Sequence, residues 1–401
     1  MLDADALRER VEELAAIERR AGSAGEKAAA VLIADELRSL GARVEVEEER
    51  VHGTYWWPLG LLAALGVAGA VSNTRFLRLA AGALAVGGAW DDLRLNRRFV
   101  RRRLLRQKRT LNVVAEFGDA SAEDTVLVIA HYDAAHSGLV FHPEIPRVVL
   151  RRFPWLLARS NTTPPTMWGT VAGPAMVALS SVTSGRLGRR LRGLGALVSL
   201  GYVGAMIDIG LRRVVPAAND NASGVAAMLS LAHTLAAQPP RMRVLLLATG
   251  SEESILEGMC AFGRRHFATL PGDRTHVINI DTVGSPRLLV LEAEGMLGMW
   301  KYGQAFVARV HGCARELEIE LVPKLRFRNA TDGAVALKAG YQTVTLASVD
   351  EYKTPSNYHW PTDTPENVNY ETVADAARLV NGVIRELDVS ASAARSDSAE
   401  L

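Results

Sequence analysis

The feature that most constrains the fold is an alternation of apolar strand-like runs with helical segments, which continues from Val225 almost to the C-terminus. Arg243–Ala248 (RVLLLA) is almost wholly apolar, as a strand buried on both faces would be. Runs of this kind that alternate with helices are typical of an α/β fold whose sheet is covered on both faces. The other strands expected in this half are His276–Ile280, Arg287–Leu291 and Gln342–Ala347, and the helices are 225–236, 257–267, 297–316 and 371–387.

The N-terminal half continues the pattern, with two interruptions. Two helices are expected at Asp3–Arg20 and Ala24–Leu40, because apolar residues recur at three- and four-residue spacing. Strands are expected at Val44–Val51, Leu111–Phe117 and Thr125–Ala130. The last residues, 389–401, are rich in Ser, Ala and Asp, and we expect a disordered tail there.

Composition excludes several classes of protein. A formal net charge of +2 gives no overall field for nucleic acid. The two cysteines, Cys260 and Cys313, lack CxxC spacing, which indicates a reducing compartment and argues against thiolate zinc or a disulfide scaffold. The charged N-terminus has no apolar core, so we expect no secretory signal.

Polar residues follow the expected strands at the positions where open α/β sheets bind ligands, beyond the carboxyl ends of the strands. Taken singly, each has an ordinary alternative, such as a structural histidine, a solvated acidic pair or a turn-forming aspartate. Their convergence on one edge of one sheet favours a shared site. The candidate residues are His131, Asp133, Asp220, Glu252, Glu253, Asp281 and His359.

Asp220 lies in the segment PAANDNASG (Pro216–Gly224), directly before an apolar helical run. Asn, Asp and Ser are also the residues that cap a helix start, and a simple cap cluster is the alternative interpretation. Three consecutive Asn or Asp residues are more than a cap needs. We therefore interpret Asp220 as a metal ligand.

A mixed histidine and carboxylate set suits Zn²⁺ or a similar divalent ion, and a pair of such ions requires a bridging carboxylate. We assign the bridge to Asp220, one ion to His131 and Asp281, and the other to His359 and Glu253.

Three further residues have expected roles at this site. Asp133, two residues after His131, would orient the imidazole. Glu252 would be the general base that takes a proton from the metal-bound water. Tyr358, next to His359, could donate to the oxyanion that forms when the carbonyl is attacked.

At these residues the sequence resembles the di-zinc aminopeptidases related to bacterial leucyl aminopeptidase and aminopeptidase Y. Arg19–Glu49 is also similar to the N-terminal segment of that family. The motifs that match, in order, are HYD (131–133), NDNASG (219–224), SEES (251–254), IDTVG (280–284) and YHWPTDT (358–364).

The resemblance implies a three-layer α/β/α fold with a central mixed, mostly parallel sheet, two zinc ions per chain, and hydrolysis of the peptide bond next to a free N-terminus. It covers residues 1–52 and 110–388, which would form one catalytic domain. The family includes glutaminyl cyclases and inactive receptor-like members. A cyclase-like transferase and a non-hydrolytic peptide-binding scaffold therefore remain the alternatives. NATDGAVA (329–336) departs from the family's pattern, which leaves the side-chain preference open.

Two apolar insertions also depart from the family, at 53–109 and 150–215. Each contains a pair of apolar runs, expected to form hairpins that together make four membrane spans, with tryptophans near their ends. The expected location is the inner or plasma membrane, multi-pass, with the catalytic domain cytoplasmic. The Arg-rich run 93–109 would contact anionic lipid head groups. Buried core helices, a dimerisation arm or an interfacial hairpin are the alternatives, and the oligomeric state is open.

Overall fold

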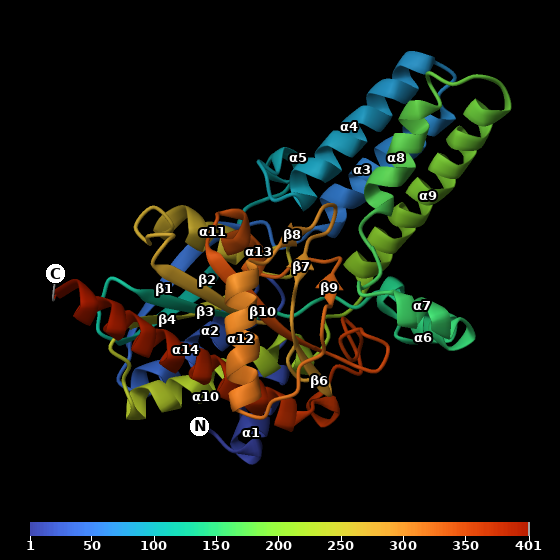
Figure 1. The fold of residues 1–401 in the computed structure, drawn as a ribbon. Helices are drawn as coiled ribbons and strands as arrows, with labels where there is room; N and C mark the ends of the chain where they lie inside the picture. Colours follow the sequence, from blue (N-terminus) through green and yellow to red (C-terminus); the bar gives the residue numbers. More distant parts are fainter. Residues whose placement is uncertain (400–401) are drawn as a thin grey trace.

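A seven-stranded sheet forms the centre of the α/β domain in the computed structural model, which describes residues 1–399 and the side chains of residues 1–391 (Figure 1). In spatial order the strands are β1 (Arg43–Val51), β2 (Lys108–Gly118), β4 (Arg243–Thr249), β3 (Thr125–His131), β5 (Thr275–Ile280), β10 (Gln342–Val349) and β6 (Arg287–Val290).

The sheet is mixed, as expected, and its parallel pairing is confined to the centre. β4, β3, β5 and β10 run parallel to one another, whereas β1, β2 and β6 pair antiparallel with their neighbours. Because the four central strands run in one direction, their carboxyl ends meet at the same edge of the sheet. This edge is where sequence reasoning placed the site.

Both faces of the sheet are buried, and β3 shows how the sequence achieves this. Val126, Val128 and Ala130 contribute to one hydrophobic cluster, whereas Leu127 and Ile129 contribute to another on the opposite face. The two-residue period of a strand produces this division. The helices in the first cluster are α1 (Ala4–Ala15), α2 (Ala24–Ser39), α10 (Ser223–Ala237), α12 (Gln304–Glu316) and α14 (Tyr370–Ala399), and those in the second are α11 (Glu257–His266) and α13 (Gly333–Lys338).

A small three-stranded sheet, in the order β8–β7–β9, lies next to the main sheet. Its strands are β7 (Ala293–Glu294), β8 (Trp300–Lys301) and β9 (Arg326–Phe327). The buried carboxylate of Glu294 links it to Thr331, whose backbone N–H donates to that carboxylate at 2.7 Å. The short turns of the domain are η1 (Leu139–Phe141), η2 (Ala218–Ala222) and η3 (Pro365–Asn367).

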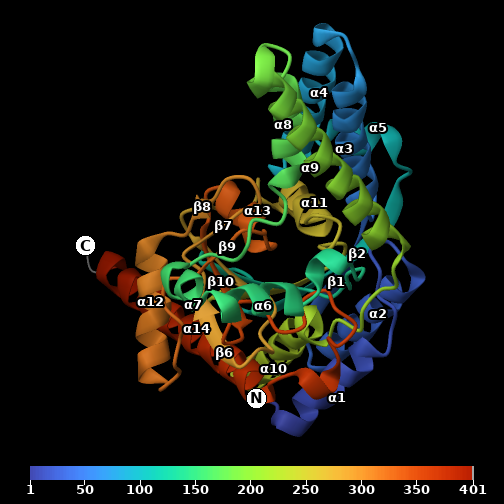
Figure 2. The ribbon, with the colours of Figure 1, turned by 90° about the vertical axis from the view of Figure 1, so that its right-hand side faces the viewer.

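The two apolar insertions come together as one helical arm that projects from the α/β domain (Figures 1 and 2). Its helices are α3 (Trp56–Val71), α4 (Arg75–Leu93), α8 (Gly169–Leu179) and α9 (Gly185–Leu211). At the base of the arm lie α5 (Phe99–Leu104), α6 (Glu144–Arg152) and α7 (Pro154–Arg159). α9 begins nine residues earlier than the apolar run expected at Leu194, so the basic residues 186–192 belong to its first turns.

The four-span prediction is not supported by the lengths of these helices. Among the described residues, only α9 is both long and apolar enough to cross a membrane, and α3 and α8 are shorter apolar helices. Only 22% of the apolar window in α9 is buried, so α9 is not a core helix.

A disordered tail is expected at 389–401, and the structure continues α14 to Ala399, with residues 400–401 outside the described part of the chain. The segment from Val389 to Ala399 is rich in alanine, which has the highest helix propensity, and it extends a helix that is already formed.

Candidate metal centre

All five predicted metal ligands meet at the carboxyl edge of the four parallel strands. His131 is the last residue of β3, Asp281 follows β5, and Glu253 lies in the loop after β4. Asp220 lies in η2, immediately before α10, and His359 lies in the loop after β10. These positions bring together residues as far apart in sequence as 131 and 359.

Asp220 lies between the two histidines. Its Oδ1 is 3.2 Å from Nε2 of His131, and its Oδ2 is 3.2 Å from Nε2 of His359. The carboxylate therefore presents one oxygen to each side of the site, as a bridging ligand requires.

The other two carboxylates are divided between the histidines as predicted. Glu253 Oε2 lies 3.2 Å from Nε2 of His359, and Asp281 Oδ2 lies 4.0 Å from Nε2 of His131. Ligand atoms of His131, Asp220 and Glu253 all lie within 4.8 Å of one another. Each histidine therefore has a second carboxylate near it, and Asp220 lies between the two histidines.

The capping role expected for the Asp220 segment belongs to its neighbour. Asn221 Oδ1 accepts from the backbone N–H of Gly224 at 3.0 Å and from that of Thr282 at 2.9 Å. Asn221 thus fastens the start of α10 to the end of β5, which leaves the Asp220 carboxylate free to face the histidines.

Two residues that the sequence analysis did not single out hold the backbone of this segment. Asp363 accepts from the backbone N–H groups of Asn219 and Asp220, at 2.7 and 3.1 Å. Arg19 is fully buried and donates to the carbonyls of Tyr132 and Ala217, at 2.8 and 3.0 Å. Asp363 lies inside the motif YHWPTDT and could have been noticed there, whereas an arginine in an N-terminal helical pattern gives no such signal.

Asp133 contacts more than the imidazole that it was expected to orient. Its Oδ1 lies 3.5 Å from Nδ1 of His131. Its carboxylate also accepts from the backbone N–H groups of Glu252 and Glu253, at 2.9 and 3.0 Å. One buried aspartate therefore fixes the first histidine relative to the glutamate pair.

Tyr358 is suited to donate a hydrogen bond in the site. Its ring stacks on that of His359, with centroids 3.9 Å apart. Burial raises the pKa of its hydroxyl well above the usual value, and the nearby Asp220, Glu253 and Glu252 act in the same direction. The hydroxyl therefore keeps its proton at neutral pH.

The charge of the site fits divalent cations. Burial, with a further contribution from the Asp220 carboxylate, raises the pKa of Glu253 to about 7 and that of Asp281 to about 6. Buried carboxylates at this density need positive charge nearby. Oε1 of Glu253 and Nδ1 of His359 are buried without a hydrogen-bond partner. The donor set of nitrogen and oxygen atoms is the one that zinc takes.

A cleft of about 420 Å³ opens onto this centre. Glu252, Glu253, Tyr358 and His359 line it on the metal side. Apolar residues of α6 form the opposite wall, and Asn329 and Ala330 of the divergent motif also contribute. Asp332 of that motif is instead buried, and Thr249 donates a hydrogen bond to it.

Two arginines of the Arg-rich run 93–109 are buried in the protein and cannot contact lipid. Arg101 is fully buried and pairs with Asp92 at 2.7 Å. It also lies 3.6 Å from Glu257 and donates to the carbonyl of Ser254. Arg98 donates to the carbonyl of Ile255 at 2.6 Å. Two arginines of the run therefore hold the loop that carries Glu252 and Glu253.

Comparison with known proteins agrees with this chemistry. Residues 203–384 match the sequence model of Peptidase family M28. No curated protein sequence matches the chain. The family match supports, over this part of the chain, the predicted resemblance to a peptidase family.

Solved structures show the same fold at low sequence identity. A zinc aminopeptidase from Bacillus subtilis superimposes with a TM-score of 0.57 at 16% identity, covering 96% of this chain and 95% of that one. A zinc-dependent exopeptidase from Parabacteroides distasonis gives 0.57 at 16%, covering 95% and 97%. A glutaminyl cyclase from Bacteroides thetaiotaomicron gives 0.58 at 13%, covering 95% and 97%. The predicted exopeptidase-like fold is confirmed.

Proposed function

We propose that this protein is a membrane-associated aminopeptidase that removes N-terminal residues from peptides with the help of two zinc ions. The observation that carries the proposal is the placement of Asp220, whose two carboxylate oxygens each lie 3.2 Å from a different histidine. His131 and Asp281 would hold one ion, Glu253 and His359 the other, and Asp220 both. When bound, the ions would supply Lewis acidity and lower the pKa of water.

Glu252 is the proton-transfer residue in this proposal. Its side chain lines the cleft, and its backbone is fixed by Asp133. Burial raises the pKa of its carboxyl well above the usual range, with further contributions from Glu253 and Asp332. A raised pKa suits a group that takes a proton from the attacking water and returns it to the leaving amine. The Tyr358 hydroxyl would donate to the developing oxyanion.

The test is a peptide digest by purified protein supplied with zinc. We expect single residues to be released from free N-termini and acetylated peptides to be left intact. Glu252→Gln should retain zinc and lose most hydrolysis, by a factor on the order of 10² or more, because the amide cannot accept the proton. Undiminished turnover in this variant would reject Glu252 as the base.

The same digest separates the alternatives. Glutaminyl cyclases are among the structural neighbours, so peptides with N-terminal glutamine belong in the library. Loss of ammonia from those peptides without release of residues would assign a cyclase. Binding of peptides with no chemical change would assign a scaffold.

Membrane association is proposed from the packing of the arm. A water-soluble bundle buries its large apolar side chains, whereas the arm exposes them. Small residues fill its interior: a Cβ added at Gly173 would lie 2.6 Å from Ser199 Oγ, and one at Gly82 would lie 2.6 Å from the carbonyl of Pro174. The large apolar side chains face outward. Those at least half exposed include Leu61, Val71, Phe76, Leu77, Leu84, Leu179, Val182, Leu187, Leu194, Leu197 and Leu200.

Small residues inside and large apolar residues outside are the pattern of helices packed in lipid. An apolar surface of this extent is unfavourable in water. Several arginines at the base of the arm are exposed, among them Arg97, Arg102 and Arg103, and could meet anionic head groups on the cytoplasmic side.

A further inference from the structure

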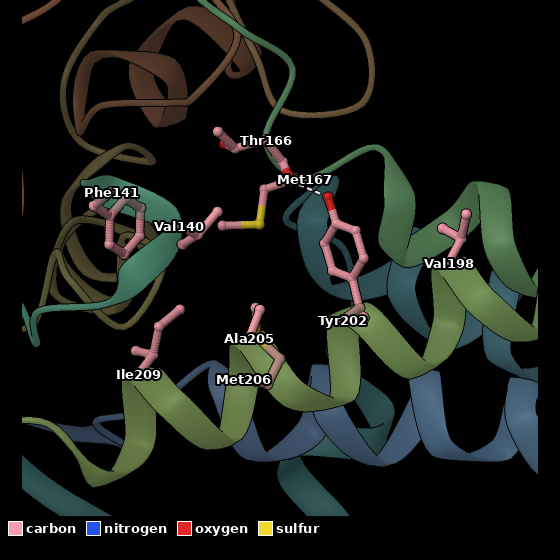
Figure 3. Close-up of a pocket in the computed structure, with 10 residues that line it drawn as sticks. Val140, Phe141, Thr166, Met167, Val198, Tyr202, Ala205, Met206 and Ile209 are labelled. Carbon is pink, nitrogen blue, oxygen red and sulfur yellow. Dashed lines mark hydrogen bonds between the residues drawn. The ribbon is translucent and has the colours of Figure 1, made fainter. Parts of the chain in front are cut away.

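A second apolar pocket lies between α9 and the catalytic cleft (Figure 3). Its volume is about 360 Å³, within the range of roughly 300–1,000 Å³ found for ligand sites. Tyr202, Ala205, Met206 and Ile209 extend from α9 on one side of it. Because α9 belongs to an insertion, this pocket is a feature of the arm rather than of the α/β domain.

The pocket adjoins the catalytic cleft and shares a wall with it. Val140, Phe141, Thr166 and Met167 line both. The ring of Phe141 also packs against that of His359, with centroids 4.6 Å apart. The side chain of Phe141 therefore separates this pocket from a ligand of the metal centre.

The walls of the pocket are held in place by polar contacts that leave its surface apolar. The hydroxyl of Tyr202 donates to the carbonyl of Thr166 (Figure 3). Asp208, the one carboxylate in the apolar part of α9, accepts from the backbone N–H of Leu139 at 2.6 Å and from Nε of Arg212 at 2.7 Å. These contacts tie the 139–141 turn and the segment around Thr166 to α9.

We propose that this pocket is a subsite for an apolar side chain of the peptide whose N-terminus lies at the metal centre. The proposal rests on the proposed peptidase function and adds a substrate class, namely peptides with a large apolar residue near the N-terminus. The wall shared with the cleft points to the peptide as the occupant, since a chain bound at the metals would reach the pocket past Phe141. Binding there would remove the apolar surface of the substrate side chain and that of the pocket wall from water.

Two glycines on α9 provide a matched test. Gly201 lines the pocket, whereas Gly204, one turn further along, does not. A Cβ added at either glycine meets no atom within 4 Å, so both positions accept a side chain. Gly201→Phe would fill the pocket, and Gly204→Phe is the control.

The measurement is kcat/KM for the cleavage of each peptide in a set of short peptides by the zinc-loaded enzyme. All peptides share one N-terminal residue and carry either alanine or leucine at each of the next three positions. The wild-type enzyme should prefer leucine at one of these positions by about tenfold or more. Gly201→Phe should remove that preference, and Gly204→Phe should retain it. Ala205→Phe, which points into the pocket, repeats the test at a second position.

The outcomes separate the two proposals. If the wild-type enzyme cleaves none of the peptides, both the peptidase function and the subsite are rejected. If it cleaves them with no preference for leucine, or if the pocket-filling variants keep the preference, the subsite alone is rejected. A preference that phosphatidylcholine vesicles abolish in the wild-type enzyme would assign the pocket to a lipid acyl chain and overturn the peptide subsite.

Discussion

The backbone around Asp220 is positioned from both sides of its turn. Asp363 accepts from the backbone N–H groups of Asn219 and Asp220, and Arg19 donates to the carbonyl of Ala217. A bridging carboxylate must present both oxygens in a fixed plane, so these contacts matter as much for metal binding as the ligand itself. Neither residue is a metal ligand.

We expect Asp363→Asn to weaken metal binding by about 10–100-fold, because an amide group can accept from only one of the two backbone N–H groups. The measurement is competition for zinc against a chelator of known affinity. Asp273→Asn, on the surface, is the control and should bind zinc like the wild type. Equal affinity in Asp363→Asn would show that the turn holds its shape without this contact.

The buried carboxyl of Glu294 makes the stability of the fold depend on pH, independently of the metal centre. Burial raises its pKa to about 8, and hydrogen bonds from Tyr302 and Thr331 oppose this shift. The folded protein therefore holds the proton, whereas the unfolded chain releases it near pH 4.3. Because the pKa is raised on folding, the contribution of Glu294 to stability is largest below about pH 4.3 and is lost as the pH rises toward 8.

Glu294→Gln should therefore raise the free energy of unfolding only slightly at pH 5, by about 1 kcal/mol, and more at pH 9, by about 2 kcal/mol or more. Denaturant unfolding at the two pH values measures this. Glu320→Gln, at an exposed position, should follow the wild-type curve at both. A loss of stability in Glu294→Gln at pH 9 would contradict the assignment of a neutral carboxyl.

At the scale of elements, the loop between β4 and α11 connects the metal centre to the arm. It carries Glu252 and Glu253. The carbonyl of Ser254 accepts from Arg101 in α5, and that of Ile255 accepts from Arg98, which directly precedes α5. Glu257, at the start of α11, also accepts from the backbone N–H groups of His52 and Gly53, at 2.8 and 2.9 Å, just before the arm begins. The position of the arm therefore bears on the position of Glu252 and Glu253.

Arg101→Gln should lower the free energy of unfolding by about 3–5 kcal/mol, because it leaves the buried carboxylates of Asp92 and Glu257 without a full positive charge. At a temperature where the variant is folded, kcat should fall as well, since the Glu252 loop loses its anchor. Arg103→Gln, exposed on the same helix, should change stability by less than about 0.5 kcal/mol. Equal stability of the two variants would contradict this role for Arg101.

Sequence reasoning recovered the elements that local pattern determines. Arg243–Ala248, as an apolar β-rich run, could be little other than a buried strand, and the ligands at strand ends followed from it. The burial of Arg98 and Arg101 could not be predicted, because nothing in the sequence distinguishes these two from the other basic residues in 93–109, nine in all. Which of them turn inward depends on carboxylates distant in sequence, such as Glu257. Arg19 escaped notice because its partners are backbone carbonyls distant in sequence, which leave no pattern around it.

At the scale of the whole molecule, the arm and the α/β domain follow opposite packing rules. The domain buries its large apolar side chains, and the arm exposes them. Sequence reasoning identified the apolar helices, but it could not show that two insertions separated by residues 110–149 join into a single bundle (Figure 2).

If the outer face of the arm contacts lipid, Leu197→Glu should reduce co-flotation of the protein with lipid vesicles in high salt. A charge deep in a bilayer costs about 2.5–3.5 kcal/mol or more. Val31→Glu places the same charge at a half-exposed position of α2 and should float like the wild type. Undiminished flotation of Leu197→Glu would place this face of the arm outside the membrane.

The central claim is that Asp220 joins two metal ions, and the zinc content of the purified protein tests it most directly. Elemental analysis after dialysis should find two zinc ions per chain in the wild-type protein. Asp220→Ala should hold less than one, while its circular dichroism spectrum remains that of the wild type. A wild-type protein with one zinc ion or none, or an Asp220→Ala variant that still holds two, would contradict the account.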